Sequence, residues 1–133
     1  MYEYLLHSVN IFFFVFHSVL VLFNMFGWLR PRWRLMNFIT LSLTAFSWFI
    51  IGIWHGWGYC FCTDWHWKIR ELLGYHDMSN SYIHFLVLKF TGINFPVNLV
   101  DTSTVIVFFC SFAISIYLNI KNWRTRLLKQ NKF

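Results

Sequence analysis

Residues 4 to 28 read YLLHSVNIFFFVFHSVLVLFNMFGW, an almost unbroken run of apolar side chains. A helix needs about twenty such residues to cross the hydrocarbon core of a bilayer. Two further stretches, residues 36 to 57 and 98 to 120, have similar length and character. No cleavage site of small residues ends the first run, so we expect it to remain as a membrane span. The sequence therefore predicts three transmembrane helices.

The composition of the whole chain favours the same fold class. Of its 133 residues, 58% are hydrophobic and only 12% are charged, which is more apolar surface than a soluble domain of this size can bury. The 17 phenylalanines and 8 tryptophans lack the alternation with polar residues that a transmembrane barrel requires. Since no linker or repeat divides the chain, we expect residues 1 to 133 to form one all-α membrane domain.

The segment between the second and third spans, residues 58 to 97, is expected to form a cap at the membrane surface. Thr63 is a good N-cap and Gly74 a good helix end, so a helix is predicted over residues 64 to 73. We expect this helix to lie on the membrane through an apolar face formed by Trp65, Ile69, Leu72 and Leu73.

A second short helix is predicted later in the same cap. It would begin after Ser79, Asn80 and Ser81, each of which is a candidate N-cap, and end before Gly92. Its apolar run contains His84 and is too short for a span, so we expect an interfacial or re-entrant helix.

Basic residues gather on one side of the predicted bundle. The loop after the first span and the C-terminal tail hold eight of the eleven basic residues and no acid: Arg30, Arg32, Arg34, Lys121, Arg124, Arg126, Lys129 and Lys132. The remaining segments hold three basic residues and all five acids. Because loops rich in Lys and Arg remain in the cytoplasm, we expect the N-terminus outside and the C-terminus inside. The positive charge then belongs to a membrane rim, and no nucleic-acid partner is expected.

Each span carries a stripe of polar residues. We interpret the Ser and Thr residues as packing contacts between helices. An ionisable group in hydrocarbon costs at least a few kcal/mol, so His17 and Asp101 are candidate functional residues. By depth, Asp101 is expected to lie level with His7 and His55. These four residues form a candidate polar cluster that would relay a proton, bind a metal or fix the bundle.

A second candidate site lies at the start of the cap. His55, Cys60, Cys62 and His66 offer two imidazoles and two thiols within twelve residues, ligands that suit zinc or copper. The Cys-x-Cys spacing is unlike that of familiar zinc sites, and the alternative is an aromatic turn with buried thiols. Oxidation of Cys60 and Cys62 to a strained disulfide is a further alternative. A haem between His7 and His55 is disfavoured by the bulky Phe faces of the spans.

The residues after the second span resemble the motif of a known family. Cys60, Thr63 and Arg70, followed by Gly74 and then Tyr82-Ile83, resemble an uncharacterised family of small bacterial integral membrane proteins, a domain of unknown function. Its members often show Cys-Pro-Leu-Thr, then an acidic-Asn pair, then Leu-Arg. The corresponding residues here are Cys60-Phe61-Cys62-Thr63, His66-Trp67 and Ile69-Arg70. The resemblance implies a fold class and no established activity. In a bacterium, the orientation expected from the charges would place the cap on the periplasmic side of the inner membrane.

The sequence contains no Ser-His-Asp pattern, P-loop or dinucleotide fingerprint, so we do not expect an enzyme. The preferred hypothesis is an accessory or assembly subunit that binds membrane lipid, the helices of other membrane proteins or further copies of itself. The first alternative is a metal- or redox-binding membrane protein that uses the His, Cys and Asp residues of the outer side. The second is a small proton-linked transporter that uses His17 and Asp101.

Overall fold

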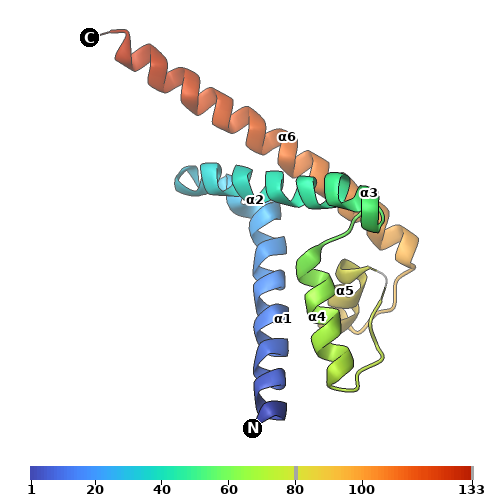
Figure 1. Ribbon diagram of the computed structural model, residues 1–133. Coiled ribbons are helices and arrows are strands. Elements are labelled where there is room, and N and C mark those ends of the chain that lie inside the picture. Colours follow the sequence, from blue (N-terminus) through green and yellow to red (C-terminus); the bar gives the residue numbers. More distant parts are fainter. Residues whose placement is uncertain (80, 133) are drawn as a thin grey trace.

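The computed structural model describes residues 1–79 and 81–132, and its regular structure in these ranges is entirely helical (Figure 1). The predicted all-α class is confirmed. In chain order the elements are α1 (Tyr2–Phe26), η1 (Gly27–Leu29), η2 (Pro31–Trp33), α2 (Arg34–Phe46), η3 (Ser47–Ile51), α3 (Gly52–His55), α4 (Phe61–Leu72), α5 (Tyr82–Thr91) and α6 (Val97–Gln130).

Three helical runs are long and apolar enough to span a membrane: Tyr2–Leu29, Pro31–His55 and Val97–Gln130. They coincide with the three predicted spans. The second run joins α2, a π-helical turn (η3) and α3. The third continues well beyond the predicted end at residue 120, because the basic residues of the C-terminal tail are also helical and extend α6 to Gln130. The short helices α4 and α5 occupy the predicted cap.

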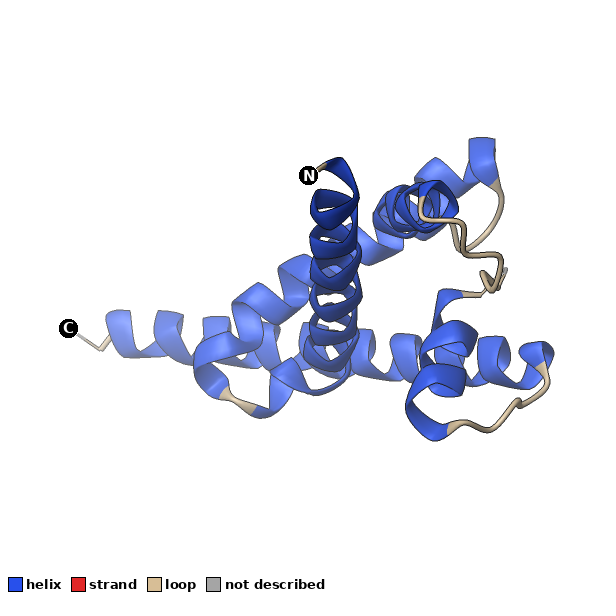
Figure 2. Ribbon diagram, turned by 90° about the horizontal axis from the view of Figure 1, so that it is seen from below, coloured by secondary structure: helices blue, strands red, loops and turns tan. Residues whose placement is uncertain are grey.

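The three long helices do not form a parallel bundle. α2 packs against α6, whereas α1 crosses α2 steeply in both views (Figures 1 and 2). α4 packs beside α1 along its N-terminal half, and Phe14 of α1 contacts Phe85 and Phe90 of α5. The cap is therefore held mainly by the first span and completes the side of the molecule that α2 and α6 leave open.

Amides fasten the end of α1 to α2. The Asn37 side chain donates to the Phe23 carbonyl over 2.7 Å, and the Asn24 side chain donates to the Thr44 hydroxyl over 3.1 Å. Asn37 is fully buried. Gly27 lies against this joint, where a Cβ atom would come within 2.8 Å of the Asn37 amide nitrogen. The absence of a side chain at Gly27 thus lets the two helices approach closely.

A similar joint connects α2 to α6. The Asn119 side chain donates to the backbone carbonyl of Arg34 over 3.0 Å, and the Arg34 guanidinium donates to the Asn122 side chain over 3.4 Å. Leu41 of α2 and Ser115 of α6, which lie close in sequence to these residues, are fully buried. Small and amide-bearing residues therefore contribute where the long helices meet, beside ring contacts such as Phe38–Phe112 and Trp48–Phe108.

Of the two cap helices, α4 begins earlier than predicted, whereas α5 begins after one of its predicted caps. α4 begins at Phe61, so Thr63 lies inside the helix and the predicted N-cap is wrong; Cys60 occupies that position without a side-chain cap bond. Gly74 ends the helix with φ +82°, as expected. The Ser81 hydroxyl caps α5 by accepting the His84 amide over 3.3 Å, and the alternative cap at Asn80 lies outside the described residues.

Replacing Gly27 by alanine tests the joint between α1 and α2. The backbone at Gly27 is ordinary right-handed helix, so alanine introduces no φ strain and its only cost is the contact with Asn37 and Phe23. We expect Gly27→Ala to lower the free energy of unfolding by about 1 to 3 kcal/mol, measured by thermal unfolding in detergent. Gly52→Ala is the matched control, because its nearest contact is an ordinary 3.5 Å. Equal melting temperatures for the two variants would contradict the close approach.

Candidate functional site

The face of α4 that is buried within the protein is polar. His66 is 0% exposed and Arg70 is 6% exposed, whereas Trp65 and Leu72 are 53% and 63% exposed. The apolar face was expected to lie on the membrane, but the burial of the polar face against α1 was not predicted; α1 supplies its polar partner, Asn10. Buried polar side chains persist where they are hydrogen bonded, and His66 and Arg70 each have at least one such partner.

Side chains from three helices, α1, α4 and α5, meet at His66. Its Nε2 atom lies 2.8 Å from the Asn10 Oδ1 atom of α1, and its Nδ1 atom lies 2.9 Å from the Tyr82 hydroxyl of α5. The Phe13 ring stacks at 5.8 Å and the Trp67 ring at 5.6 Å from the imidazole. The imidazole is therefore enclosed, and both of its nitrogens are used.

The partners of His66 determine its tautomer. An arginine has no acceptor, so the Asn10 atom that lies 3.4 Å from the Arg70 guanidinium is its amide oxygen. That oxygen must also accept from His66, so Nε2 carries the proton and Nδ1 accepts from the Tyr82 hydroxyl. Burial first, and then the positive charge of Arg70, lower the pKa of His66 from 6.5 to about 4. The imidazole is neutral at pH 7.

Arg70 is held by one carboxylate and two rings. Its guanidinium lies 2.5 Å from Asp77, 4.3 Å from the Tyr75 ring centroid and 4.9 Å from the Phe85 ring centroid. Asp77 also pairs with Lys89 of α5 over 2.8 Å. Burial alone would raise the pKa of Asp77, but hydrogen bonds from Lys89 and Arg70 and their charges hold it at about 2. Asp77 thus connects α4 and α5 through two cations.

His17 extends the cluster into the first span. Its ring stacks on Tyr82 with centroids 4.0 Å apart, and the side chain is 7% exposed. Within the described ranges its Nδ1 atom has no hydrogen-bond partner. Burial also raises the pKa of Tyr82. We call the assembly of Asn10, His17, His66, Arg70, Asp77 and Tyr82 the cap cluster.

The predicted polar cluster of His7, His17, His55 and Asp101 is not assembled. His7, His55 and Asp101 are exposed, and none of the hydrogen bonds among the described residues joins any two of the four. His55 instead stacks on the Tyr59 ring at 4.4 Å. The prediction assumed helices aligned by depth, and the steep crossing of α1 and α2 removes that alignment.

The four candidate metal ligands are also not brought together. In the part of the chain that the structure describes, no three His, Cys, Asp or Glu side chains are placed to hold a metal ion. His66 turns inward toward α1, whereas His55 and Cys60 line an open hollow of about 220 Å³ at the turn before α4. Cys60 and Cys62 are free thiols.

The thiol pair gives limited support to the redox alternative. Burial, followed by the nearby charge and hydrogen bond of Cys60, raises the pKa of Cys62 to about 11. A thiol that stays protonated at neutral pH is a poor nucleophile, because the thiolate is the reactive form. Cys62 is therefore not activated for exchange.

Sequence reasoning missed Asn10, Asp77 and Tyr82 as members of the cap cluster. The available signal was the spacing of Thr63, His66 and Arg70, which places them along one helical face. The residues on that face are the ones that resemble the family motif, and they are not the most apolar side chains of the helix.

Comparison with known proteins gives one result. The family described as "Protein of Unknown function (DUF2784)" matches residues 7–120. The chain belongs to this family. No curated protein and no solved structure matches the chain. The predicted resemblance to an uncharacterised family is confirmed, and the matched range covers the second long helix, the whole cap and most of the first and third long helices.

The neutral state of His66 predicts acid sensitivity between pH 6.5 and 4. The unfolded chain binds a proton near pH 6.5 and the folded chain only near pH 4, so stability is complete above 6.5 and falls as the pH drops to 4. We expect a loss of about 3 kcal/mol over this range, measured as melting temperature against pH in detergent. His66→Gln should make this dependence clearly shallower. Asp77 does not contribute here, since its stabilisation is lost only below its usual pKa of 3.8. An unchanged slope in His66→Gln would contradict the assignment.

Proposed function

We propose that this protein is an accessory or assembly subunit of the membrane, which binds partner helices and lipid through its uncovered apolar faces. The observation that supports the proposal most directly is the low burial of the three long helices. Only 11%, 22% and 17% of the residues in their most apolar windows are buried within the chain. The helices therefore leave most of their surface to other molecules.

The clearest uncovered face lies on α1. It is formed by side chains at helical spacing, each 43% to 61% exposed: Ile11, Phe12, Val15, Phe16, Val19 and Leu22. Phe12 and Phe16 stack on each other at 5.8 Å and present one continuous aromatic surface. Helix association in membranes depends on packing of such surfaces more than on removal of apolar groups from water. This face, which we call the Phe face, suits either acyl chains or a second helix.

The buried polar residues support a structural role for the cap. His66 and Arg70 use their polar groups on Asn10, Tyr82 and Asp77. A catalytic or transport residue needs access to a substrate or proton path. The cap cluster instead joins α1, α4 and α5, so we favour a rigid platform over an enzyme.

The alternative functions receive less support from the geometry. A transporter relay between His17 and Asp101 would need the two to communicate, yet His17 is buried against Tyr82 while Asp101 is exposed on α6. A metal site would need ligands that converge, and the four candidates point to different surroundings.

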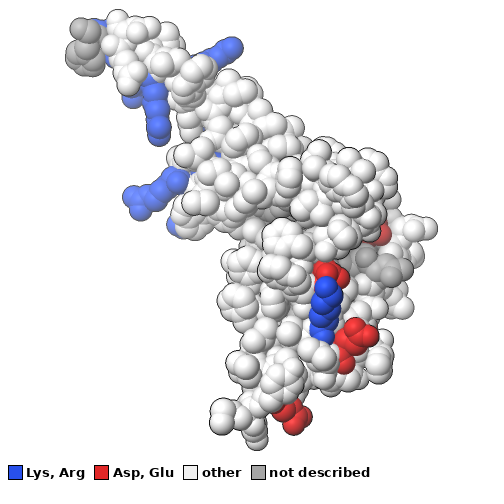
Figure 3. All heavy atoms as spheres, in the orientation of Figure 1, with Lys and Arg blue, Asp and Glu red and all other residues white. Residues whose placement is uncertain are grey.

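We further propose that the chain lies in a bacterial inner membrane with its basic end in the cytoplasm and its cap in the periplasm. Figure 3 shows Lys and Arg around the start of α2 and the far half of α6, and acidic side chains around the cap and the N-terminus. This separation of charge favours the stated orientation through the positive-inside bias.

Native mass spectrometry in mild detergent tests the assembly proposal. We expect the wild-type chain to retain a second copy, another membrane protein or bound lipid, because the Phe face needs a covering partner. Phe12→Ala/Phe16→Ala should lose that partner. The control is Trp65→Ala/Leu72→Ala, which also removes exposed apolar side chains, but from the cap. A wild-type spectrum that contains only bare monomer would reject the proposal.

Cysteine labelling in intact cells tests the orientation. In a chain with Cys60, Cys62 and Cys110 replaced by serine, a single cysteine is placed at exposed Glu71 or at exposed Lys129. A maleimide that does not cross membranes should label Glu71→Cys before lysis and Lys129→Cys only after lysis. The reverse pattern would show that the cap faces the cytoplasm.

A further inference from the structure

The C-terminal part of α6 extends beyond the length of a membrane span. The 34 residues of the whole helix measure about 51 Å at the helical rise of 1.5 Å per residue, whereas the hydrocarbon core is about 30 Å thick. If the apolar part begins near Val97, the helix leaves the hydrocarbon near Tyr117. The residues that follow therefore lie at the depth of the lipid headgroups.

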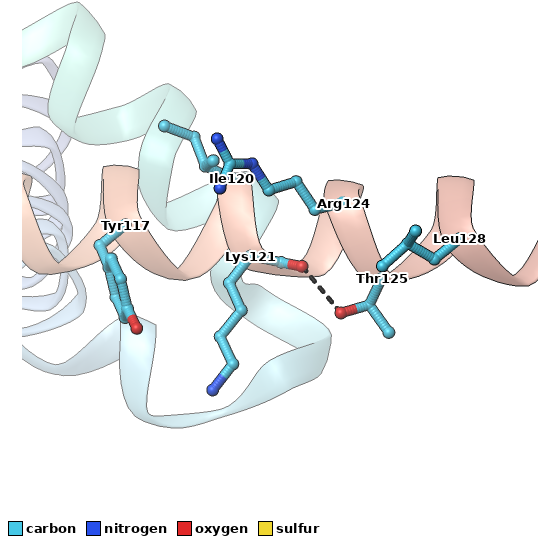
Figure 4. A pocket seen from close by; sticks show the side chains of 6 residues that line it. All are labelled: Tyr117, Ile120, Lys121, Arg124, Thr125 and Leu128. Carbon is cyan, nitrogen blue, oxygen red and sulfur yellow. Dashed lines mark hydrogen bonds between the residues drawn. The ribbon is translucent and has the colours of Figure 1, made fainter.

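That end of α6 combines cationic and apolar side chains. A hollow of about 300 Å³ is lined by residues of α6 alone (Figure 4): Tyr117, Ile120, Lys121, Arg124, Thr125 and Leu128. Lys121 projects away from the helix, and Arg124 lies back along it toward Ile120 (Figure 4). Thr125 donates to the Lys121 backbone carbonyl over 2.9 Å.

Among the residues that the structure describes, these cations have no acidic partner. Every Asp and Glu lies at or before Asp101, and the ion pairs of the described residues connect only Asp64 and Asp77 with Lys68, Arg70 and Lys89. Lys121 and Arg124 are both exposed. Their charge therefore remains available to an anion from outside the chain.

The loop between α1 and α2 adds to the same surface. The Arg34 guanidinium contacts Asn122, which precedes Trp123 and Arg124, so the loop is anchored to this part of α6. Arg30 lies 4.7 Å from the Trp33 ring centroid in the same loop. The basic side chains of both segments appear together at one end of the molecule in Figure 3. We call this surface, from Arg30 to Arg34 together with Lys121 and Arg124, the basic rim.

We infer that the basic rim binds the headgroups of anionic phospholipids, with Lys121 and Arg124 each available to a lipid phosphate and Tyr117 and Ile120 against the lipid below the headgroups. Charge complementarity and depth both favour this occupant, because basic side chains next to a span attract acidic lipids. The inference deepens the lipid-binding part of the proposed function and shares with it only the placement of the chain in a membrane.

Lipid retention measured by native mass spectrometry tests this inference. The purified chain is mixed in detergent with equal amounts of phosphatidylglycerol and phosphatidylcholine. We expect preferential retention of phosphatidylglycerol by the wild type, and a loss of preference of about fivefold for each charge removed in Lys121→Gln and Arg124→Gln. The matched control is Lys68→Gln, which removes an exposed charge from the cap and should keep the preference.

The other outcomes distinguish the source of the anion. Equal retention of both lipids by the wild type would overturn the inference, and so would an effect of Lys68→Gln as large as that of Lys121→Gln. Competition by millimolar inorganic phosphate alone would indicate a small-anion site and also overturn it. Size-exclusion profiles and melting temperatures identify any variant that misfolds, and the other of the two single substitutions then tests the inference. Loss of helix partners in Phe12→Ala/Phe16→Ala with unchanged lipid preference would separate this inference from the assembly proposal.

Discussion

The neutral imidazole of His66 is the interaction on which the cap depends. One side chain joins α1 through Asn10 and α5 through Tyr82, and it does so from α4, so three elements distant in sequence share one hydrogen-bonded centre. A buried imidazolium would need a nearby anion, but the adjacent charge is the Arg70 cation. Arg70 therefore has two effects: it fixes the orientation of Asn10, and it adds to the effect of burial that keeps His66 uncharged. Asp77 neutralises Arg70 from the other side, away from the imidazole.

The same arrangement explains why a short cap can remain ordered at a membrane surface. α4 and α5 are only 12 and 10 residues long, too short to be stable as isolated helices in water. Their order comes from tertiary contacts, which include the hydrophobic cluster of Tyr82, Phe85 and Leu86 packed against Phe14 and Trp67. The polar centre gives these contacts direction, since hydrogen bonds are lost when a helix shifts by one residue.

Hydropathy predicted the spans because length and composition are local properties of the chain. The observed long helices contain the predicted spans over residues 4 to 28, 36 to 57 and 98 to 120, except that the second predicted span extends two residues beyond its helix. The candidate site was less predictable because it depends on how helices cross. His7, His55 and Asp101 were grouped by depth, and the steep approach of α1 to α2 separates them. The buried polar face of α4 was missed for a related reason: a hydropathy pattern identifies the apolar face with Trp65, whereas the burial of His66 depends on Asn10 of another helix.

The steep crossing also bears on how the chain is completed. Helices that cross steeply touch over a short length, so α1 shares with α2 only the joint of Asn24, Asn37 and Gly27. Beyond that joint, α1 is covered on one side by the cap and carries the Phe face on the other. A parallel bundle would have buried the Phe face against α2 and α6. The cap thus fixes the direction of α1, and by doing so it leaves the Phe face open to a partner or to lipid.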